Sequence, residues 1–345
     1  MKTYHKLFLI LILLFAKAAA FAQTDDPKVL LKQGIALNDS GKYDQAIAKY
    51  EQAIKIDPNY QDAWYEKSYT LFTSGKEKQA IPSLEKVIQL NPSSAQAYDM
   101  LGSIYDDLKD SDKALNYYQL GIKADSTYQR LHFNLAITYY RLGKYAESEA
   151  SAIKAIKLNP KHASSQRVYG MALYHQHKNA FAILAFCNFL LIEPQSDRSL
   201  TIYKYIDTIF KQQKDKNIVL TSVDFSGKEL KPLTIAEMSV NLGVTTKDTL
   251  SKLGNTSGAD QMMIQLKVVF NGVGGVSQKL GTNKDFFWKF YADYFYKLGQ
   301  SDNMLAFARY ITLSAFKDEN LQWFKEHDTE LKDFSKWISA TDRNF

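Results

Sequence analysis

The chain has 345 residues, of which 46% are hydrophobic and 23% are charged. This composition is that of a globular protein and excludes a disordered chain or a collagen-like fibre. The formal net charge is +6, and it would fall to +3 without the first 22 residues, which carry three lysines and no acid. A balance so close to neutral gives no general reason to expect nucleic-acid binding.

The first 22 residues have the layout of a secretory signal peptide. A basic start with Lys2 and Lys6 precedes the apolar run 7–15, and small residues follow as far as Ala22. This order predicts export to the periplasm or the medium, with cleavage after Ala22. The alternative is a retained membrane anchor, which the short run disfavours because a spanning helix needs about 20 apolar residues. No later stretch is apolar enough to span a membrane.

Proline-containing turns mark an internal repeat in the next part of the chain. The turns recur at intervals of 34, 68 and 34 residues: Asp57-Pro58, Asn91-Pro92, Asn159-Pro160 and Glu193-Pro194. A period of 34 residues fits all of them and predicts a repeat architecture. The five units that result cover 23–196 and are 27–60, 61–94, 95–128, 129–162 and 163–196.

Small residues recur at fixed positions inside each unit. The eighth position is always glycine, serine or alanine, and the twentieth is always alanine or serine. Such residues predict two helices that cross closely in every unit. The fifteenth position holds Gly41, Gly75, Lys109, Gly143 and His177, and a glycine there favours the end of the first helix.

The unit with Gly34, Gly41, Ala46, Tyr50 and Pro58 resembles a tetratricopeptide repeat (TPR), and the unit that follows does so too. The resemblance covers residues 27–196 and is typical of an exported bacterial TPR protein. It implies an all-α fold, an α-α superhelix or TPR solenoid, with a diverged helical second half. Lys and Asn of chaperone-binding TPR clamps are replaced here by Leu31 and Ile35, so that mode of recognition is not expected.

The resemblance also implies a binding groove, because the first helices of TPR units line a concave face. Unit three is acidic there, with Asp99, Asp106 and Asp107. Ile137, Met171 and His175 occupy further lining positions. The residues that we expect to bind a peptide or protein partner are Tyr65, Tyr69, Phe72, Arg130, Phe133, Tyr140, Arg141, Arg167 and Tyr174. The alternative is that several of these aromatics pack in the core.

The region 197–345 lacks a clear period. Residues 200–213 suit the first helix of a sixth unit, and the mixed segment 214–285 predicts shorter helices joined by loops. Within it, the glycine-rich stretch 271–279 predicts a flexible loop. A TPR-like pair is expected near 285–318, followed by a C-terminal helical cap with Trp323, Phe324, Phe334 and Trp337 facing inward.

Chemically active residue types are few. We expect His175 and His177 to be exposed residues of a turn, and Cys187 to be a small buried hydrophobe. No catalytic or metal-binding motif is present, so no cofactor is expected. The sequence therefore favours a non-catalytic interaction scaffold of the bacterial cell envelope. The alternatives are an enzyme with its active site in 197–345 and an envelope glycan-binding protein.

Overall fold

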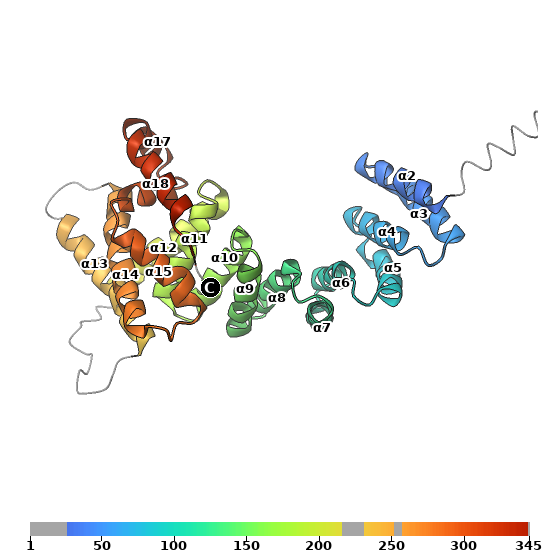
Figure 1. The fold of residues 1–345 in the computed structure, drawn as a ribbon, viewed down its shortest axis with the longest axis horizontal. Coiled ribbons are helices and arrows are strands. Elements are labelled where there is room, and N and C mark those ends of the chain that lie inside the picture. Colours follow the sequence, from blue (N-terminus) through green and yellow to red (C-terminus); the bar gives the residue numbers. More distant parts are fainter. Residues whose placement is uncertain (1–25, 216–230, 252–256, 344–345) are drawn as a thin grey trace, which may run out of the picture. The chain divides into compact units, whose positions relative to one another are not determined.

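The structure is a computed structural model that describes residues 26–215, 231–251 and 257–343 (Figure 1). The expected signal peptide, residues 1–22, lies outside the described residues. Within them every regular element is helical, which confirms the all-α prediction. The chain divides into two compact units, Met1–Thr138 and Tyr139–Phe345.

Residues 27–192 form helical hairpins in which each first helix has 13 residues and each second helix has 14. The helices are α2 (Pro27–Asp39), α3 (Tyr43–Ile56), α4 (Gln61–Thr73), α5 (Glu77–Leu90), α6 (Ala95–Asp107), α7 (Ser111–Ala124), α8 (Gln129–Arg141), α9 (Tyr145–Leu158), α10 (Ala163–His175) and α11 (Asn179–Ile192).

The turn between the helices of each hairpin has the same left-handed backbone at the fifteenth position. Gly41, Gly75 and Gly143 have φ of 71°, 76° and 71°, whereas Lys109 and His177 adopt 65° and 59°. A side chain costs about 1–2 kcal/mol in this region of φ, which glycine avoids. The shared hairpin therefore overrides the local preference of Lys109 and His177.

The close crossing inside a hairpin depends on the eighth position. A Cβ atom added to Gly34 would lie 2.3 Å from Tyr50 Cε1, and one added to Gly102 would lie 2.3 Å from Tyr118 Cε1. The twentieth position, represented by Ala80, is fully buried in every hairpin. The expected close crossing of the two helices is therefore present.

Consecutive hairpins are joined by a hydrogen bond from the fourth position. The indole of Trp64 donates to the Pro58 carbonyl over 2.9 Å, and the Gln166 amide donates to the Pro160 carbonyl over 2.9 Å. Nε2 of His132 lies 3.0 Å from the Ser126 carbonyl oxygen, so this histidine requires the tautomer protonated on Nε2. Three different side chains thus make one equivalent contact.

Beyond residue 196 the chain remains helical, and the helices before residue 281 are longer than the sequence predicts. The elements of this region are α12 (Asp197–Asp215), α13 (Pro232–Ser251), α14 (Gly258–Leu280), the π-helical turn η2 (Trp288–Ala292), α15 (Asp293–Gly299), α16 (Met304–Ile311), α17 (Lys317–Glu326) and α18 (Asp328–Ala340). The prediction of short helices with loops over 214–285 is therefore wrong for the described residues. The stretch 271–279 is helical rather than a flexible loop, because it lies inside α14.

Close packing explains two of the glycines of α14. A Cβ atom added to Gly272 would lie 2.4 Å from Cβ of Ser239 on α13, and one added to Gly274 would lie 2.2 Å from Cδ2 of Tyr296 on α15. Larger residues at Gly272 and Gly274 would force the neighbouring helices apart. Gly272 and Gly274 therefore serve helix packing, as small residues do at the hairpin crossings.

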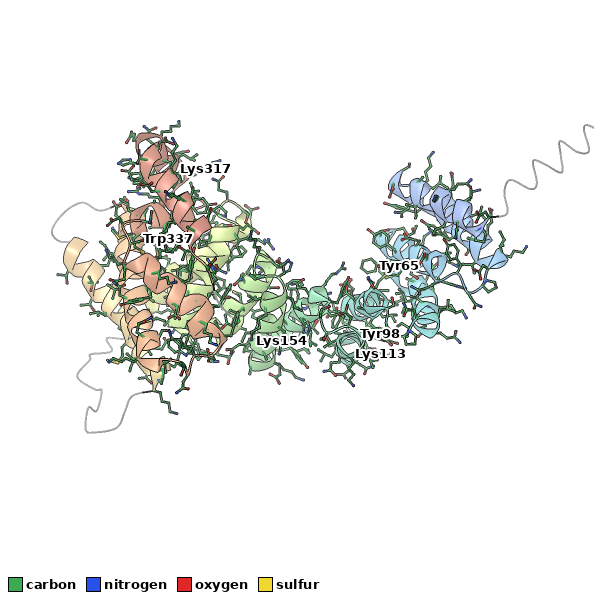
Figure 2. The ribbon with its side chains drawn as sticks, in the orientation of Figure 1. Tyr65, Tyr98, Lys113, Lys154, Lys317 and Trp337 are labelled. Carbon is green, nitrogen blue, oxygen red and sulfur yellow. The ribbon has the colours of Figure 1, made fainter. Side chains whose placement is uncertain are left out.

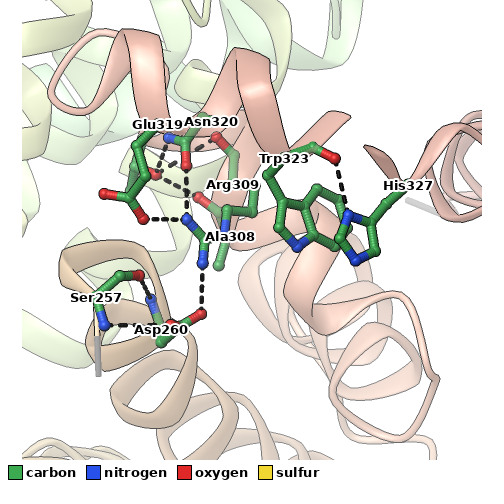
Figure 3. Close-up of polar contacts among 9 residues, drawn as sticks. Ser257, Asp260, Ala308, Arg309, Glu319, Asn320, Trp323 and His327 are labelled. Carbon is green, nitrogen blue, oxygen red and sulfur yellow. Dashed lines mark hydrogen bonds and ion pairs between the residues drawn. The ribbon is translucent and has the colours of Figure 1, made fainter. Parts of the chain in front are cut away.

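The last helices are held by a buried arginine (Figure 3). Arg309 on α16 is 6% exposed. Its guanidinium donates to Asp260 Oδ1 over 2.8 Å and to Asn320 Oδ1 over 3.3 Å, and it forms an ion pair with Glu319. A buried charge is tolerated when it is paired in this way, so α14, α16 and α17 are tied together.

The expected inward side chains of the last two helices differ in burial. Phe324 and Phe334 are buried, whereas Trp323 and Trp337 are only half-buried. Trp323 stacks on His327 with ring centroids 4.3 Å apart.

Among the helices that the structure describes, none combines the length and apolar character needed to cross a membrane.

Candidate partner-binding surfaces

The first candidate surface lies on α4 and is called the α4 surface: Tyr65, Tyr69 and Phe72. Their spacing of four and three residues places them on one face of the helix. Tyr69 is 41% exposed. Tyr65, labelled in Figure 2, and Phe72 are half-buried against the core of the second and third hairpins. The face is therefore anchored at both ends and open at Tyr69.

Asp99 was expected to make the groove acidic, but its side chain is only 3% exposed. Arg130 Nε lies 2.9 Å from Asp99 Oδ2, and the Asn134 amide donates to Asp99 Oδ1 over 2.7 Å. Burial raises the pKa of Asp99, while Arg130 and Asn134 oppose that rise. Asp99 therefore links α6 to α8 instead of presenting a free carboxylate.

Arg130 keeps part of its surface open although it pairs with Asp99. Its side chain is 60% exposed. Burial raises the pKa of Tyr65 to about 12, and the neighbouring groups that influence it include Tyr128, Asp99 and Arg130. Side chains from α4, α6 and the start of α8 thus lie near one another.

The other expected residues of α8 differ in exposure. Phe133 and Ile137 are half-buried, and Arg141 is exposed at the end of the helix. Of the acidic residues, Asp106 is half-buried and Asp107 is exposed.

A second candidate surface lies in the unit Tyr139–Phe345 and is called the tyrosine surface: Tyr140, Tyr174, His175 and Tyr205. The hydroxyl of Tyr140 lies 3.0 Å from His175 Nε2. The rings of Tyr174 and His175 meet edge to face at 5.4 Å, and those of Tyr174 and Tyr205 at 5.0 Å. Side chains from α8, α10 and α12 therefore form one continuous aromatic row.

Arg167 lies half-buried on α10. Burial is the main cause that lowers the pKa of Arg167, and the charge of Arg198 adds to it. The carboxylate of Glu193 is near enough to raise that pKa in part, against these two larger effects. The Nε atom of Arg167 is buried without a hydrogen-bond partner.

The nine expected residues fall into two groups. Tyr65, Tyr69, Phe72, Arg130 and Phe133 belong to the unit Met1–Thr138, and Tyr140, Arg141, Arg167 and Tyr174 belong to the unit Tyr139–Phe345. Each group contains aromatic and basic side chains. Met171, expected to line the groove, is buried instead.

Two aromatic residues escaped the sequence analysis. Tyr205 occupies the ninth position of a unit that begins at residue 197, so extending the period by one unit would have found it. Tyr145 stacks on His175 with ring centroids 4.7 Å apart, but it starts a second helix, where the expected lining positions do not lie. Only the fold brings Tyr145 to this row.

The remaining chemically active residues lie where the sequence placed them. His175 ends α10, His177 lies in the following turn, and both are exposed. Cys187 is fully buried on α11, which raises the pKa of its thiol. Within the part of the chain that the structure describes, no cluster of three histidine, cysteine, aspartate or glutamate side chains is placed to hold a metal ion.

Comparison with family models identifies the repeats. Models of the tetratricopeptide repeat match residues 34–75, 61–94, 95–128 and 129–162. The chain therefore carries TPR units, and the helical hairpins form a TPR-like solenoid. No curated protein matches the chain.

Solved structures similar to this one include proteins described as TPR proteins. The crystal structure of MamA has 24% identity and a TM-score of 0.45, and it covers 48% of this chain and 91% of its own. YrrB, described as a TPR protein with an unusual peptide-binding site, has 18% identity and a TM-score of 0.46, covering 55% and 97%. PilF of Pseudomonas aeruginosa has 19% identity and a TM-score of 0.47, covering 56% and 93%.

Proposed function

We propose that this protein is a non-catalytic scaffold that binds a peptide, or an extended segment of a protein, on the first helices of its repeats. The observation that carries the proposal is the tyrosine surface, in which Tyr140, Tyr174 and Tyr205 come from three successive first helices. A continuous row of partly exposed aromatic rings is a common recognition surface for peptides.

The α4 surface supports the same proposal. Tyr69 is 41% exposed, although its two neighbours in the sequence, Ser68 and Thr70, are fully buried. Aromatic rings at such sites contribute to binding because association removes their apolar area from water. The chain thus offers one aromatic surface in each compact unit.

A selection of peptides tests the proposal. Twelve-residue random peptides displayed on phage are selected on the full chain, and the dissociation constants of the selected peptides are measured by fluorescence anisotropy. Truncating an anchor such as Tyr69→Ala or Tyr140→Ala should weaken binding by about fivefold or more, because hot-spot residues contribute over about 1 kcal/mol each.

A matched control is Tyr43→Ala. Tyr43 is 36% exposed, close to the value for Tyr69, but it lies on the second helix α3. Its removal should leave binding unchanged, and all three variants should melt near the wild-type temperature. Failure to select any peptide, or a collapse of the melting temperature in Tyr69→Ala and Tyr140→Ala, would mean that these rings serve the fold and that the proposal is wrong.

We also propose that the scaffold works in a bacterial cell envelope. The support is the signal-peptide layout of residues 1–22. Expressed in a Gram-negative host, the protein should be recovered from the periplasm with Gln23 as its first residue, which mass spectrometry measures. Recovery of a membrane-embedded protein that retains Met1 would contradict the proposed location. That result would not test the proposed binding surfaces.

A further inference from the structure

The two long helices α13 and α14 lie side by side and enclose a cavity beyond their close contact (Figure 1). At the contact, a Cβ atom added to Gly272 would lie 2.4 Å from Cβ of Ser239. Three residues further along α14, a Cβ atom added to Gly275 would have no heavy atom of the described residues within 4 Å, apart from its own stretch of helix. On α13, Ile235 lies one turn before Ser239 and lines the cavity. The contact thus gives way to an opening within about one helical turn.

The wall of this cavity is largely apolar. Its volume is about 720 Å³, within the range that suits a small organic ligand. The apolar side chains that line it are Pro232, Ile235, Val276 and Leu280. Such a wall favours an apolar ligand body, because binding removes both apolar surfaces from water.

The charged residues of the lining are both basic. Lys231 precedes α13, Lys279 lies in the last turn of α14, and both are exposed. No aspartate or glutamate lines the cavity, and neither lysine forms an ion pair within the part of the chain that the structure describes. The lining therefore carries two uncompensated positive charges, which favour an anionic group.

Gly275 is the residue of this cavity whose identity helix packing does not explain. Glycine is less favourable than alanine inside a helix. Close contacts require glycine at Gly272 and Gly274, but no neighbour requires it at Gly275. The missing side chain keeps the cavity open along the helix backbone, as glycine does where a backbone approaches a ligand. A residue that weakens its helix and opens a cavity is typical of a binding site.

We infer that the cavity between α13 and α14 binds a single-chain anionic amphiphile, of which a fatty acid is the simplest example. Its carboxylate pairs with Lys231 and Lys279. Its chain packs against Ile235 and Val276, over the backbone of Gly275. The cavity shares no residue with the α4 surface or the tyrosine surface, so the inference does not depend on peptide binding.

Calorimetric titration of the full chain tests the class of ligand. Decanoate, 1-decanol and decyltrimethylammonium share one chain length and differ in the charge of the head group. At concentrations where each is monomeric, decanoate should bind with one-to-one stoichiometry and a negative change in heat capacity. Decanol should bind about tenfold more weakly and decyltrimethylammonium should not bind measurably. Absence of decanoate binding, or equal affinity for the anionic and cationic probes, would overturn the inference.

Variants of the full chain test the location. Gly275→Leu fills the open space and should abolish decanoate binding, with a melting temperature at or above that of wild type because leucine is the better helix former. Lys231→Met combined with Lys279→Met should weaken decanoate binding about tenfold and leave decanol binding unchanged. Lys267→Met removes an exposed charge of α14 outside the cavity and should bind decanoate as wild type does.

Three results would contradict this site. Undiminished decanoate binding in a normally melting Gly275→Leu variant would place the ligand elsewhere. If Gly275→Leu melts early, the lysine double variant decides, and an unchanged affinity for decanoate there overturns the inference. In sedimentation velocity, a wild-type dimer that Gly275→Leu dissociates and decanoate does not would show that a second copy of the chain closes the cavity.

Discussion

The eighth and twenty-fourth positions of each hairpin differ widely in size from unit to unit. Their occupants are Gly34 and Tyr50, Ser68 and Leu84, Gly102 and Tyr118, Ala136 and Ala152, and Gly170 and Phe186. All of these residues are buried, and glycine occurs wherever the second residue is aromatic. A large ring at the twenty-fourth position is thus accommodated because the facing eighth position is glycine, which has no side chain.

The change Gly102→Ala tests this relation. Alanine is favoured over glycine inside a helix by up to about 1 kcal/mol, but here its Cβ would lie 2.3 Å from Tyr118. We expect the steric clash to outweigh the gain in helix propensity and to lower the free energy of unfolding by about 1–3 kcal/mol. Urea denaturation measures this change.

The second variant in that experiment is Gly102→Ala combined with Tyr118→Leu, which imitates the residue sizes of unit two. The double variant should recover part of the loss. Strict additivity of the two single changes would show that the positions are independent and would refute the relation.

The sequence predicts contacts that recur with the period, but it does not predict contacts that depend on how two helices meet. Small residues at fixed positions are visible in the period, so the close crossing was predictable. The partner of each residue was not, because Asp99 and Arg130 are 31 positions apart and their pairing depends on how α6 meets α8. The tyrosine surface was found in part, since Tyr140 and Tyr174 are in phase while Tyr145 is not.

At the scale of elements, α14 shows where local preference misleads. Its stretch 271–279 contains three glycines, which favour a loop when judged alone. Contacts with Ser239 and Tyr296 reverse that preference, and both partners lie on other helices. No pattern within the stretch itself indicates these contacts.

Two adjacent glycines of α14 provide a matched pair for a test. Gly274→Ala should destabilise the protein because its Cβ would lie 2.2 Å from Tyr296, whereas the position of a Cβ at Gly275 is open. Gly275→Ala should therefore stabilise it by up to about 1 kcal/mol through helix propensity. Thermal unfolding of both variants measures the difference, and a shift in the same direction for both would show that α14 is packed otherwise.

Glu237 links α13 to the start of α11 and makes stability depend on pH. Its Oε1 accepts a hydrogen bond from the Ala180 backbone N–H over 2.8 Å. Burial nevertheless raises the pKa of Glu237 from 4.5 to about 7. Between these two values the folded state keeps a proton that the unfolded state releases, so stability falls as the pH rises from about 4.5 to about 7.

Glu237→Gln should remove this dependence. The neutral amide keeps an acceptor for Ala180, and the variant should gain up to about 3 kcal/mol relative to wild type between pH 5 and pH 8. Urea denaturation at both pH values measures it, with the exposed Glu330→Gln as control. An equal pH slope in wild type and Glu237→Gln would show that this carboxyl is ionised at both pH values.

At the scale of the whole molecule, the last repeat and the C-terminal helices share one core. Every residue of α11 from Ala182 to Leu190 is buried. Phe181 stacks on Phe287 with ring centroids 3.6 Å apart, and the Arg343 guanidinium donates to Asn188 Oδ1. The region 197–345 was hard to predict because its sequence has no period. Its core also includes α11, which precedes it in the chain.

Two fragments test this shared core. A fragment of residues 129–345 keeps α11 and should be soluble, with a cooperative thermal transition. A fragment of residues 197–345 loses α11 and should aggregate, because each large side chain left exposed costs about 1.5–3 kcal/mol. Light scattering and circular dichroism compare them. A monomeric 197–345 fragment that melts like the longer one would mean that the C-terminal helices form their own core.

The two repeated contacts differ in what they require of neighbouring units. The helix crossing joins two residues of the same unit, such as Gly34 and Tyr50, whose sizes must match. The bond between units needs only a donor such as Trp64, because its acceptor is a backbone carbonyl that every residue possesses. Gene duplication of a complete unit therefore preserves both contacts. A recombination breakpoint within a unit would instead separate the two crossing residues whose sizes must match. We expect such arrays to gain and lose length in whole units, with recombination joints in the turns between them.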